Sequence, residues 1–311
     1  LDTKRTLRLQ SALEEEAVEV PTSLLVNIRS VEEKEYKGKN ILELEITKLK
    51  FWIVDGQHRF EAYKGAFENN PEKWEHKLIP IDIILGADPD KERDFFFEVN
   101  SNTKGIPGGL LQELMERIAA DNPDFSKTHL KEGDVWKLKA GEIMKQLETT
   151  PVWRNKIKYP GPDGVGIIPN SGFVNGLKEL MSKEWFAILT LEMQVDVLKA
   201  FWEGADLYFK DKAGEEDPFT EYKKYSIQKA VGVSVLHRML STLREKMVQD
   251  GEPKGIFNKN VWKDYLAIIL DTEEVEFWLT GKNGQIGTYS SEAGKKELVT
   301  KFRTIIIGSL N

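Results

Sequence analysis

The spacing of apolar residues changes several times along the first third of the chain. Residues 4–16 (KRTLRLQSALEEE) carry apolar side chains at helical intervals, and the pattern ends before Pro21, which predicts a short amphipathic helix. Residues 24–28 form a short apolar run, and residues 41–47 (ILELEIT) alternate apolar with acidic or polar positions. Both stretches predict β-strands, the second of them half-buried.

An uninterrupted apolar run, FWIV at residues 51–54, is followed closely by Gly56. A run without polar positions is typical of a central strand buried on both faces, and its end would deliver Asp55 to a sheet edge. From Gln57 onward the apolar residues recur at helical spacing. The sequence therefore predicts a strand, a glycine turn and a helix in direct succession.

The next stretch repeats this order. Residues 79–85 (IPIDIIL) predict a strand, and Asp88 before Pro89 is a favourable helix start, because aspartate caps the first N–H groups and proline suits the first helical position. A further helix is predicted over residues 110–120, after a stretch rich in turn formers. Alternating strands and helices indicate an α/β (α+β) fold for this part.

Beyond residue 121 the pattern is mainly helical. We place a soft boundary there, dividing the chain into residues 1–125 and 126–311, with one continuous domain as the alternative. Two hairpins are predicted from turn-forming glycines and prolines, at residues 153–169 and 275–289. Helices are predicted at residues 173–189, 191–210, 223–249, 259–271 and 290–302.

Composition narrows the class of protein. The 311 residues, of which 40% are hydrophobic, can bury a sizeable globular core. A formal charge of -7 argues against a protein that coats nucleic acid by bulk charge, although a local basic patch remains open. The lack of cysteine excludes disulfides, cysteine-ligated zinc, iron–sulfur clusters and thiol catalysis. No apolar run approaches a membrane span, so we expect a cytoplasmic protein without a membrane partner. The chain begins at Leu1 rather than at methionine, which is consistent with a trimmed N-terminus.

The most reactive stretch is DGQHR, residues 55–59, at the predicted junction of strand and helix. A strand that turns through glycine into a helix presents unpaired N–H groups and the positive end of the helix dipole, a geometry suited to phosphate. His58 and Arg59 lie in the first turn, where the dipole disfavours cations unless an anion lies between them. The structural alternative is that Arg59 pairs with Asp55 and His58 bonds the backbone, which only fixes the turn. The residues alone leave both alternatives open.

DGQHRFEAYKG closely resembles the signature of the DGQHR-domain family, which includes the DndB proteins of DNA phosphorothioation systems and the DpdB proteins of DNA 7-deazaguanine modification systems. It also resembles the phosphate-binding turn of the wider ParB/sulfiredoxin superfamily. The resemblance covers about residues 3–120 and includes VNSNTKGIP at residues 99–107, where ParB-like domains contact nucleotide. It implies a ParB/sulfiredoxin-like domain followed by a mainly helical C-terminal portion.

The resemblance implies a site for ATP or CTP with magnesium. Gly56, His58 and Arg59 match the triphosphate-binding positions of the superfamily, and Asp55 and Gln57 match the family's own signature. Asp55, His58 and Arg59 are the catalytic residues expected for ATP hydrolysis, with Asp55 also an expected magnesium contact. Sulfiredoxins need a cysteine where this chain has Gln57, so reduction of cysteine sulfinate is excluded.

Asn100 and Asn102 are the nucleotide contacts expected in the second segment. ParB-like proteins place glutamate immediately before the asparagine and arginine three residues after it, whereas this chain has Val99 and Thr103. The resemblance therefore does not extend to metal and γ-phosphate contacts from this segment.

A second constellation, WRNKIKY, places Arg154, Lys156 and Lys158 on one face of a predicted strand, an arrangement that could line a DNA backbone. The alternative is a solvated edge strand whose lysines discourage aggregation. His237 lies in an apolar helical pattern, which favours a core or interface histidine over a ligand.

Two hypotheses of function follow. The first is a nucleotide-binding, ATP-hydrolysing component of a DNA-modification or defence system, with DNA and other proteins of that system as partners and a homo-oligomer allowed. The alternative is a DNA-binding transcriptional regulator of a DNA-modification gene cluster, with a vestigial or sensory nucleotide pocket. A ParB-like nuclease ranks lower, because the sequence shows no additional acidic metal cluster.

Overall fold

The computed structural model forms two compact units, Leu1–Ile106 and Pro107–Asn311. The helix predicted over residues 110–120 belongs to the second unit, whereas the sequence pattern had grouped it with the first. The residues that the structure describes are 3–16, 22–30, 49–101, 108–121, 134–161, 165–213, 217–281 and 284–308.

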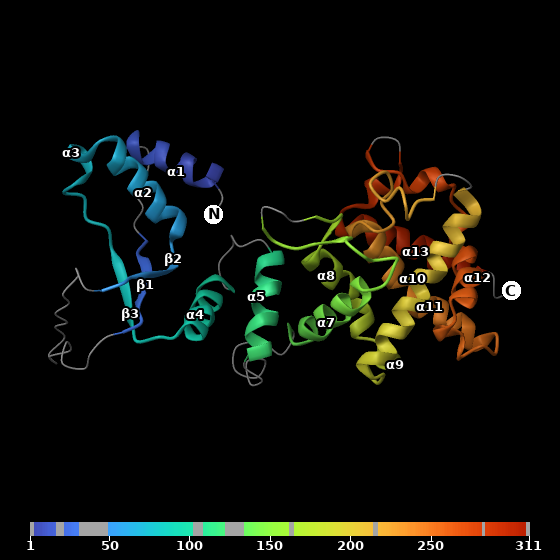
Figure 1. Ribbon diagram of the computed structural model, residues 1–311. Helices are drawn as coiled ribbons and strands as arrows, with labels where there is room; N and C mark the ends of the chain where they lie inside the picture. The colour runs from blue at the N-terminus through green and yellow to red at the C-terminus, as the bar shows by residue number, and fades with distance from the viewer. Residues whose placement is uncertain are drawn as a thin grey trace. The chain divides into compact units, whose positions relative to one another are not determined.

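In its described residues, the first unit combines a small mixed sheet with the helices α1 to α4 (Figure 1). Its elements follow the predicted order closely. They are α1 (Thr3–Glu14), β1 (Leu24–Ile28), β2 (Trp52–Asp55), α2 (Gln57–Asn69), α3 (Pro71–Trp74), β3 (Ile81–Leu85) and α4 (Pro89–Ser101). The predicted strand at residues 41–47 lies outside the described residues.

The described strands run in the order β2-β1-β3, with β1 antiparallel to β2 and parallel to β3. The prediction that FWIV is a central, buried strand is wrong, because β1 is central among the described strands and most of β2 is not buried. Only Val54 is buried in β2, and Trp52 is 42% exposed. An unbroken apolar run shows that the side chains are hydrophobic, but it does not determine whether other elements cover both faces of the strand.

The helices of the first unit pack through small residues. Ala62 and Ala66 of α2 are fully buried, which lets α1 approach closely with Leu13 between the helices. Trp74 of α3 closes this small core and meets Tyr63 edge-on, with ring centroids 6.1 Å apart. The cluster fixes α2, the helix that begins at the DGQHR motif.

The second unit is mainly helical. Its helices are α5 (Gly108–Asp121), α7 (Trp136–Glu148), α8 (Asn170–Met181), α9 (Glu184–Ala187), α10 (Leu191–Ala213), α11 (Ala230–Gln249), α12 (Lys259–Leu270) and α13 (Glu292–Gly308), with short 3-10 helices η4 (Gly255–Phe257), η5 (Val275–Trp278) and η7 (Ile286–Tyr289). Among the described residues, no helix is long and apolar enough to cross a membrane.

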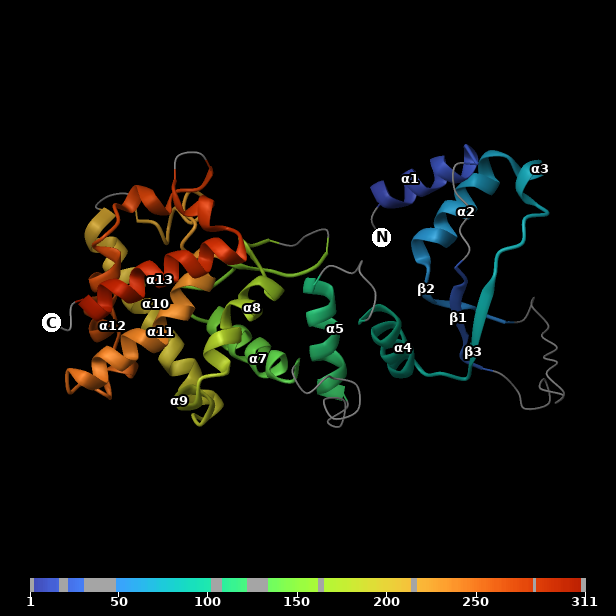
Figure 2. The ribbon, with the colours of Figure 1, turned by 180° about the vertical axis from the view of Figure 1, so that it is seen from behind.

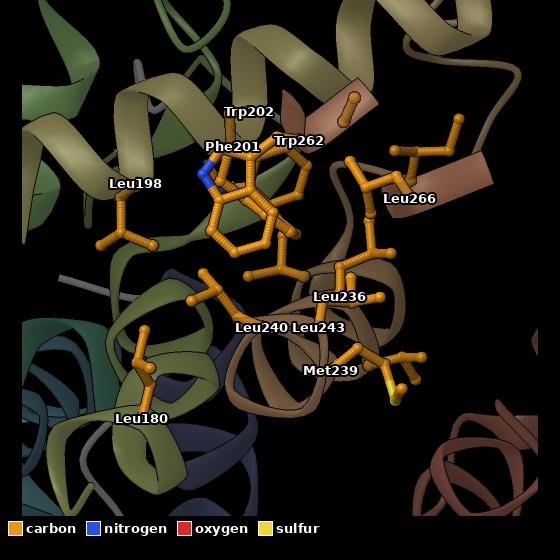
Figure 3. Close-up of a cluster of buried hydrophobic side chains, with 14 of the residues drawn as sticks. Leu180, Leu198, Phe201, Trp202, Leu236, Met239, Leu240, Leu243, Trp262 and Leu266 are labelled. Atoms are coloured by element: carbon orange, nitrogen blue, oxygen red, sulfur yellow. The ribbon is translucent and has the colours of Figure 1, made fainter. Parts of the chain in front are cut away.

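A large core fills this unit (Figure 3). Leucine, phenylalanine and tryptophan side chains of α10 converge there with those of α11 and α12, and Trp202 and Trp262 are fully buried. The helix α10 packs on α12, and α11 packs on both α8 and α13, as Figure 2 shows from behind. The periodicity that predicted these helices is thus explained by their buried faces.

Neither predicted hairpin forms. The two-residue strands β4 (Ile157–Lys158) and β5 (Ile168–Pro169) pair in parallel, which a hairpin cannot do. Residues 275–278 and 286–289 are 3-10 helices. Phe277 and Trp278 are both buried and their rings meet edge-on, with centroids 5.5 Å apart. Consecutive side chains of a strand point to opposite faces, so this contact fits a helical turn and not a strand.

Candidate functional site

The junction of β2 and α2 is built around Gly56. This residue has φ 97° and ψ 16°, in the left-handed region, and precedes the first helical residue. Its carbonyl accepts the first hydrogen bond of the helix, from Phe60 N at 2.9 Å. A Cβ placed here would lie 2.6 Å from Leu24 Cδ2 and 3.0 Å from Arg59 Nη2. Conformation and space therefore both require glycine.

Arg59 ties this junction to the residues before β1. Its Nη1 donates to the carbonyl oxygens of Thr22 at 2.9 Å and Ser23 at 2.8 Å, and to the Thr22 hydroxyl at 2.5 Å. Its Nη2 donates to Asp55 Oδ2 at 2.7 Å. Those bonds leave the Nε–H and one N–H of Nη2 as the donors that could reach a ligand. The structural alternative from the sequence analysis, in which Arg59 pairs with Asp55, is therefore observed.

The Asp55–Arg59 pair also changes the electrostatics of the helix start. Both side chains are mostly covered, 27% and 17% exposed respectively. The carboxylate compensates the guanidinium at a helix end whose N–H groups already carry partial positive charge. An incoming phosphate would meet a neutralised cation, with the helix N–H groups as the additional attraction.

Gln57 and His58 follow at the first helical positions. The Gln57 side chain turns back onto β2, where Nε2 donates to the carbonyls of Ile53 and Val54 at 3.1 Å each. This leaves its backbone N–H, rather than its side-chain amide nitrogen, as the group that could donate to a ligand. His58 is half-buried in the first turn and makes contacts within the chain.

The described start of the second predicted segment, residues 99–101, ends α4, which contacts β2. Asn100 Nδ2 donates to Phe96 O of the same helix at 2.8 Å. Its side chain therefore acts at least in part as a helix-end contact. Asn102 lies outside the described residues.

A buried polar network on the same sheet was not anticipated from the sequence. Asn27 of β1 is fully buried, and its Nδ2 donates to Ala87 O at 2.7 Å and Glu92 Oε1 at 2.6 Å. Glu92 also accepts two hydrogen bonds from Arg29 at 2.8 Å, and these bonds lower the pKa of the Glu92 carboxyl. The signal was an asparagine inside an otherwise apolar strand, LLVNI.

This network fixes an aromatic side chain at the surface. The Arg29 guanidinium lies 3.6 Å from the centre of the Trp52 ring, in a cation–π contact. Trp52 is the first residue of β2 and Asp55 is the last. Because the network contains residues of α4 and β1 and ends on the Trp52 ring, it joins α4, β1 and β2. The network thereby keeps the strand that leads into Gly56 in place.

The predicted basic strand is only partly formed. Residues 151–156 are turns, and Lys156 is buried, at 7% exposure, while Arg154 and Lys158 are exposed. Lys156 Nζ donates to Phe219 O at 2.7 Å and to Gln228 Oε1 at 2.8 Å, and lies 4.2 Å from the centre of the Tyr222 ring. The prediction that Lys156 lines a DNA-binding face is wrong, because its ammonium bonds the protein interior.

Burial also sets the titration of two groups in the second unit. It lowers the pKa of Lys156 to about 8. It lowers the pKa of His237 to about 3, and this imidazole accepts a hydrogen bond from Trp202 Nε1 at 3.0 Å. The prediction of a core histidine is confirmed for His237, which is 1% exposed.

In the described part of the chain, no group of three or more histidine, aspartate or glutamate side chains is placed to hold a metal ion. Magnesium that arrives with a nucleotide needs only one or two carboxylates, because phosphates and waters complete its shell. Asp55, whose recorded bond uses Oδ2, fits that smaller requirement through Oδ1.

Comparison of the chain with protein-family models, with curated proteins and with solved structures finds no match.

Proposed function

We propose that this chain is a nucleotide-binding, ATP-hydrolysing component of a DNA-modification system, with a first unit of the ParB/sulfiredoxin type and the DGQHR motif as its phosphate site. The observation that carries the proposal is the left-handed Gly56 between β2 and α2, with Arg59 Nη2 packed against it. Glycine there lets the chain turn from the strand straight into the helix, and a glycine turn that leads into a helix N-terminus is the arrangement that phosphate favours. The resemblance of DGQHR to a nucleotide-binding signature agrees with this reading.

Each residue of the motif then has a distinct part. The N–H groups at the start of α2 bind phosphate oxygens, and the unused Arg59 donors reach the same group. Asp55 holds Arg59 in place through Oδ2 and offers Oδ1 to a magnesium-bound water. His58, in the first turn, contacts the terminal phosphate or moves a proton. When bound, ATP supplies the phosphoanhydride bond, and water takes the γ-phosphoryl group to leave ADP and phosphate.

Arg59 has a more structural part than the sequence suggested. Its Nη1 is committed to Thr22 and Ser23, so Arg59→Ala would damage the turn as well as the proposed site. Arg59→Lys is the better probe, because it keeps the positive charge but loses the planar fork of donors. Lys64→Ala is its control, since Lys64 lies on the same helix in an exposed pair with Glu68 at 4.0 Å.

The test is calorimetric titration with ATP and with CTP, each with magnesium, and with and without duplex DNA. We expect micromolar affinity for one nucleotide in the unaltered chain and in Lys64→Ala, and at least tenfold weaker binding in Arg59→Lys. Phosphate release should then be lost in Asp55→Asn, which preserves the size of the side chain. A folded chain that binds neither nucleotide under any condition would sink the proposal and favour the DNA-binding regulator.

A further inference from the structure

The strand β3 exposes an apolar row that its neighbour does not. Ile81, Ile83 and Leu85 are 50%, 42% and 40% exposed. Their partners in the parallel ladder, Leu24, Val26 and Ile28 of β1, are at most 4% exposed. Residues paired across a ladder share one face of the sheet, so the covered part of this face stops at β1.

The strand β3 also lacks the sequence features that usually protect an edge strand. Within the described residues, β3 pairs only with β1, and Figure 1 shows the two arrows side by side. The five pairs follow one another without a bulge, and IDIIL contains neither lysine nor proline. Natural edge strands normally carry such features because they prevent pairing with other chains. The only charge in the strand, on Asp82, is bonded to the Ser23 hydroxyl.

We propose that β3 pairs edge to edge with β3 of a second copy of this chain, antiparallel about Ile83, to form a two-fold dimer with a continuous sheet. In this register Ile81 lies opposite Leu85 of the second copy, and Ile83 lies opposite its own equivalent. The same apolar row thus serves as both halves of the interface, which is the requirement for a closed two-fold contact. The inference does not depend on nucleotide binding at Gly56.

Charges at the two ends of β3 select a second copy in the antiparallel direction. Lys77 precedes the strand and Asp88 follows it, both exposed, while Asp90 is already paired with Arg93 of its own helix. Antiparallel pairing brings Lys77 of one copy near Asp88 of the other, which uses only Oδ1 to cap Lys91 N, whereas parallel pairing would bring like charges together. Such exposed pairs add little affinity, but they discriminate between the two directions.

The first test is the mass of the 311-residue chain in solution, by light scattering and sedimentation at tens of micromolar. We expect a dimer, and a monomer for Ile83→Lys, because a central lysine pair would oppose closure. The control is Ile188→Lys, which introduces the same charge at a 76% exposed isoleucine of the second unit and should stay dimeric. A monomeric unaltered chain, or a dimer that survives Ile83→Lys, would overturn the proposal.

The absence of native cysteine allows a test of the register itself. In the proposed dimer, Ile83→Cys places two thiols across the two-fold axis, at the spacing of directly opposed residues. Ile81→Cys alone places them about 13 Å apart, at roughly 3.3 Å for each of four residues of offset. A short thiol cross-linker should join Ile83→Cys to itself, and Ile81→Cys only to Leu85→Cys in a mixture. Cross-linking of Ile188→Cys as fast as that of Ile83→Cys, or with no preference among the strand positions, would show random collision or another partner surface instead.

Discussion

Arg59 Nη2 donates to Asp55 Oδ2 at 2.7 Å, and the two residues lie on either side of Gly56. Because the same guanidinium also binds the carbonyls of Thr22 and Ser23, one side chain joins three segments of the chain. The DGQHR motif therefore holds these segments together, whatever ligand it binds. Stability and binding at this site must be measured separately.

Loss of the Arg59 contacts should change the stability of α2 measurably without any ligand. We expect Arg59→Ala to lower the free energy of opening of α2 by about 2 kcal/mol, because it removes several hydrogen bonds from a charged, mostly covered donor. Amide hydrogen exchange in α2 should accelerate by roughly 30-fold, the factor that this energy corresponds to.

Lys64→Ala is again the control, since the exposed Lys64–Glu68 pair should contribute less than about 0.5 kcal/mol. Equal protection of α2 in both variants would show that the Arg59 contacts do not stabilise the junction. Reading exchange from α2 alone avoids treating two units as one cooperative transition.

Gly56 should tolerate substitution less well than a second left-handed glycine. Gly56→Ala and Gly86→Ala both place alanine at positive φ, 97° and 71°, which costs about 1 kcal/mol or more in each case. At Gly86 nothing lies within 4 Å of the added Cβ, whereas at Gly56 it meets Leu24 Cδ2 at 2.6 Å. We expect Gly56→Ala to cost at least about 1 kcal/mol more, because the neighbour must move.

Hydrogen exchange of β1 and α2 measures this difference. Similar losses for the two variants would mean that Leu24 yields freely and that only the backbone conformation demands glycine.

Lys156 should make the stability of the second unit depend on alkaline pH. Between the folded pKa of about 8 and the ordinary value of 10.5, the unfolded chain holds a proton that the folded chain has released. Stability therefore rises with pH across this window, by up to about 1.4 kcal/mol per pH unit. In Lys156→Met this contribution is absent, so the stability difference between the two proteins should change with that slope from pH 8 upward.

The measurement is urea unfolding followed by tryptophan fluorescence at pH values on both sides of 8. Burial raises the pKa of Tyr159, Tyr208 and Tyr265, but these groups are shared by both proteins and cancel in the difference. Parallel stability curves would show that the Lys156 ammonium is well solvated, contrary to its burial.

His237 should make the stability of the second unit depend on acidic pH. Its pKa in the folded chain is about 3, below the ordinary value of 6.5. Between these two pH values the imidazole is protonated in the unfolded chain but neutral in the folded chain. Stability from this group is complete above pH 6.5 and is lost progressively towards pH 3. His237→Gln keeps an acceptor for Trp202 Nε1 but cannot titrate.

Acid unfolding of the two proteins is the check. We expect His237→Gln to be less stable at neutral pH, because the core must repack, but to lose stability more slowly as the pH falls. The difference in slope should approach about 1.4 kcal/mol per pH unit. If both proteins lose stability equally as the pH falls, groups other than His237 cause the acid sensitivity of the second unit.

Local order along the chain was readable from the sequence. The alternation of strand, glycine and helix around residues 51–69, and the cap formed by Asp88, whose Oδ1 accepts from Lys91 N at 2.8 Å, follow from periodicity and backbone preference. The Asp55–Arg59 pair was one of two alternatives that the residues allowed. All of these depend on neighbours within a few positions, which is the range that a sequence pattern records.

What required the tertiary structure was the choice of which surfaces are covered. A run such as FWIV has the composition of a central strand, yet β1 takes that place and Trp52 remains exposed under Arg29. Lys156 looked like part of a cationic surface, but residues 219 and 228, far along the chain, supply the acceptors that bury it. Local composition determined the elements and the DGQHR turn, whereas contacts between distant segments decided burial, because burial depends on which surfaces meet once the chain has folded.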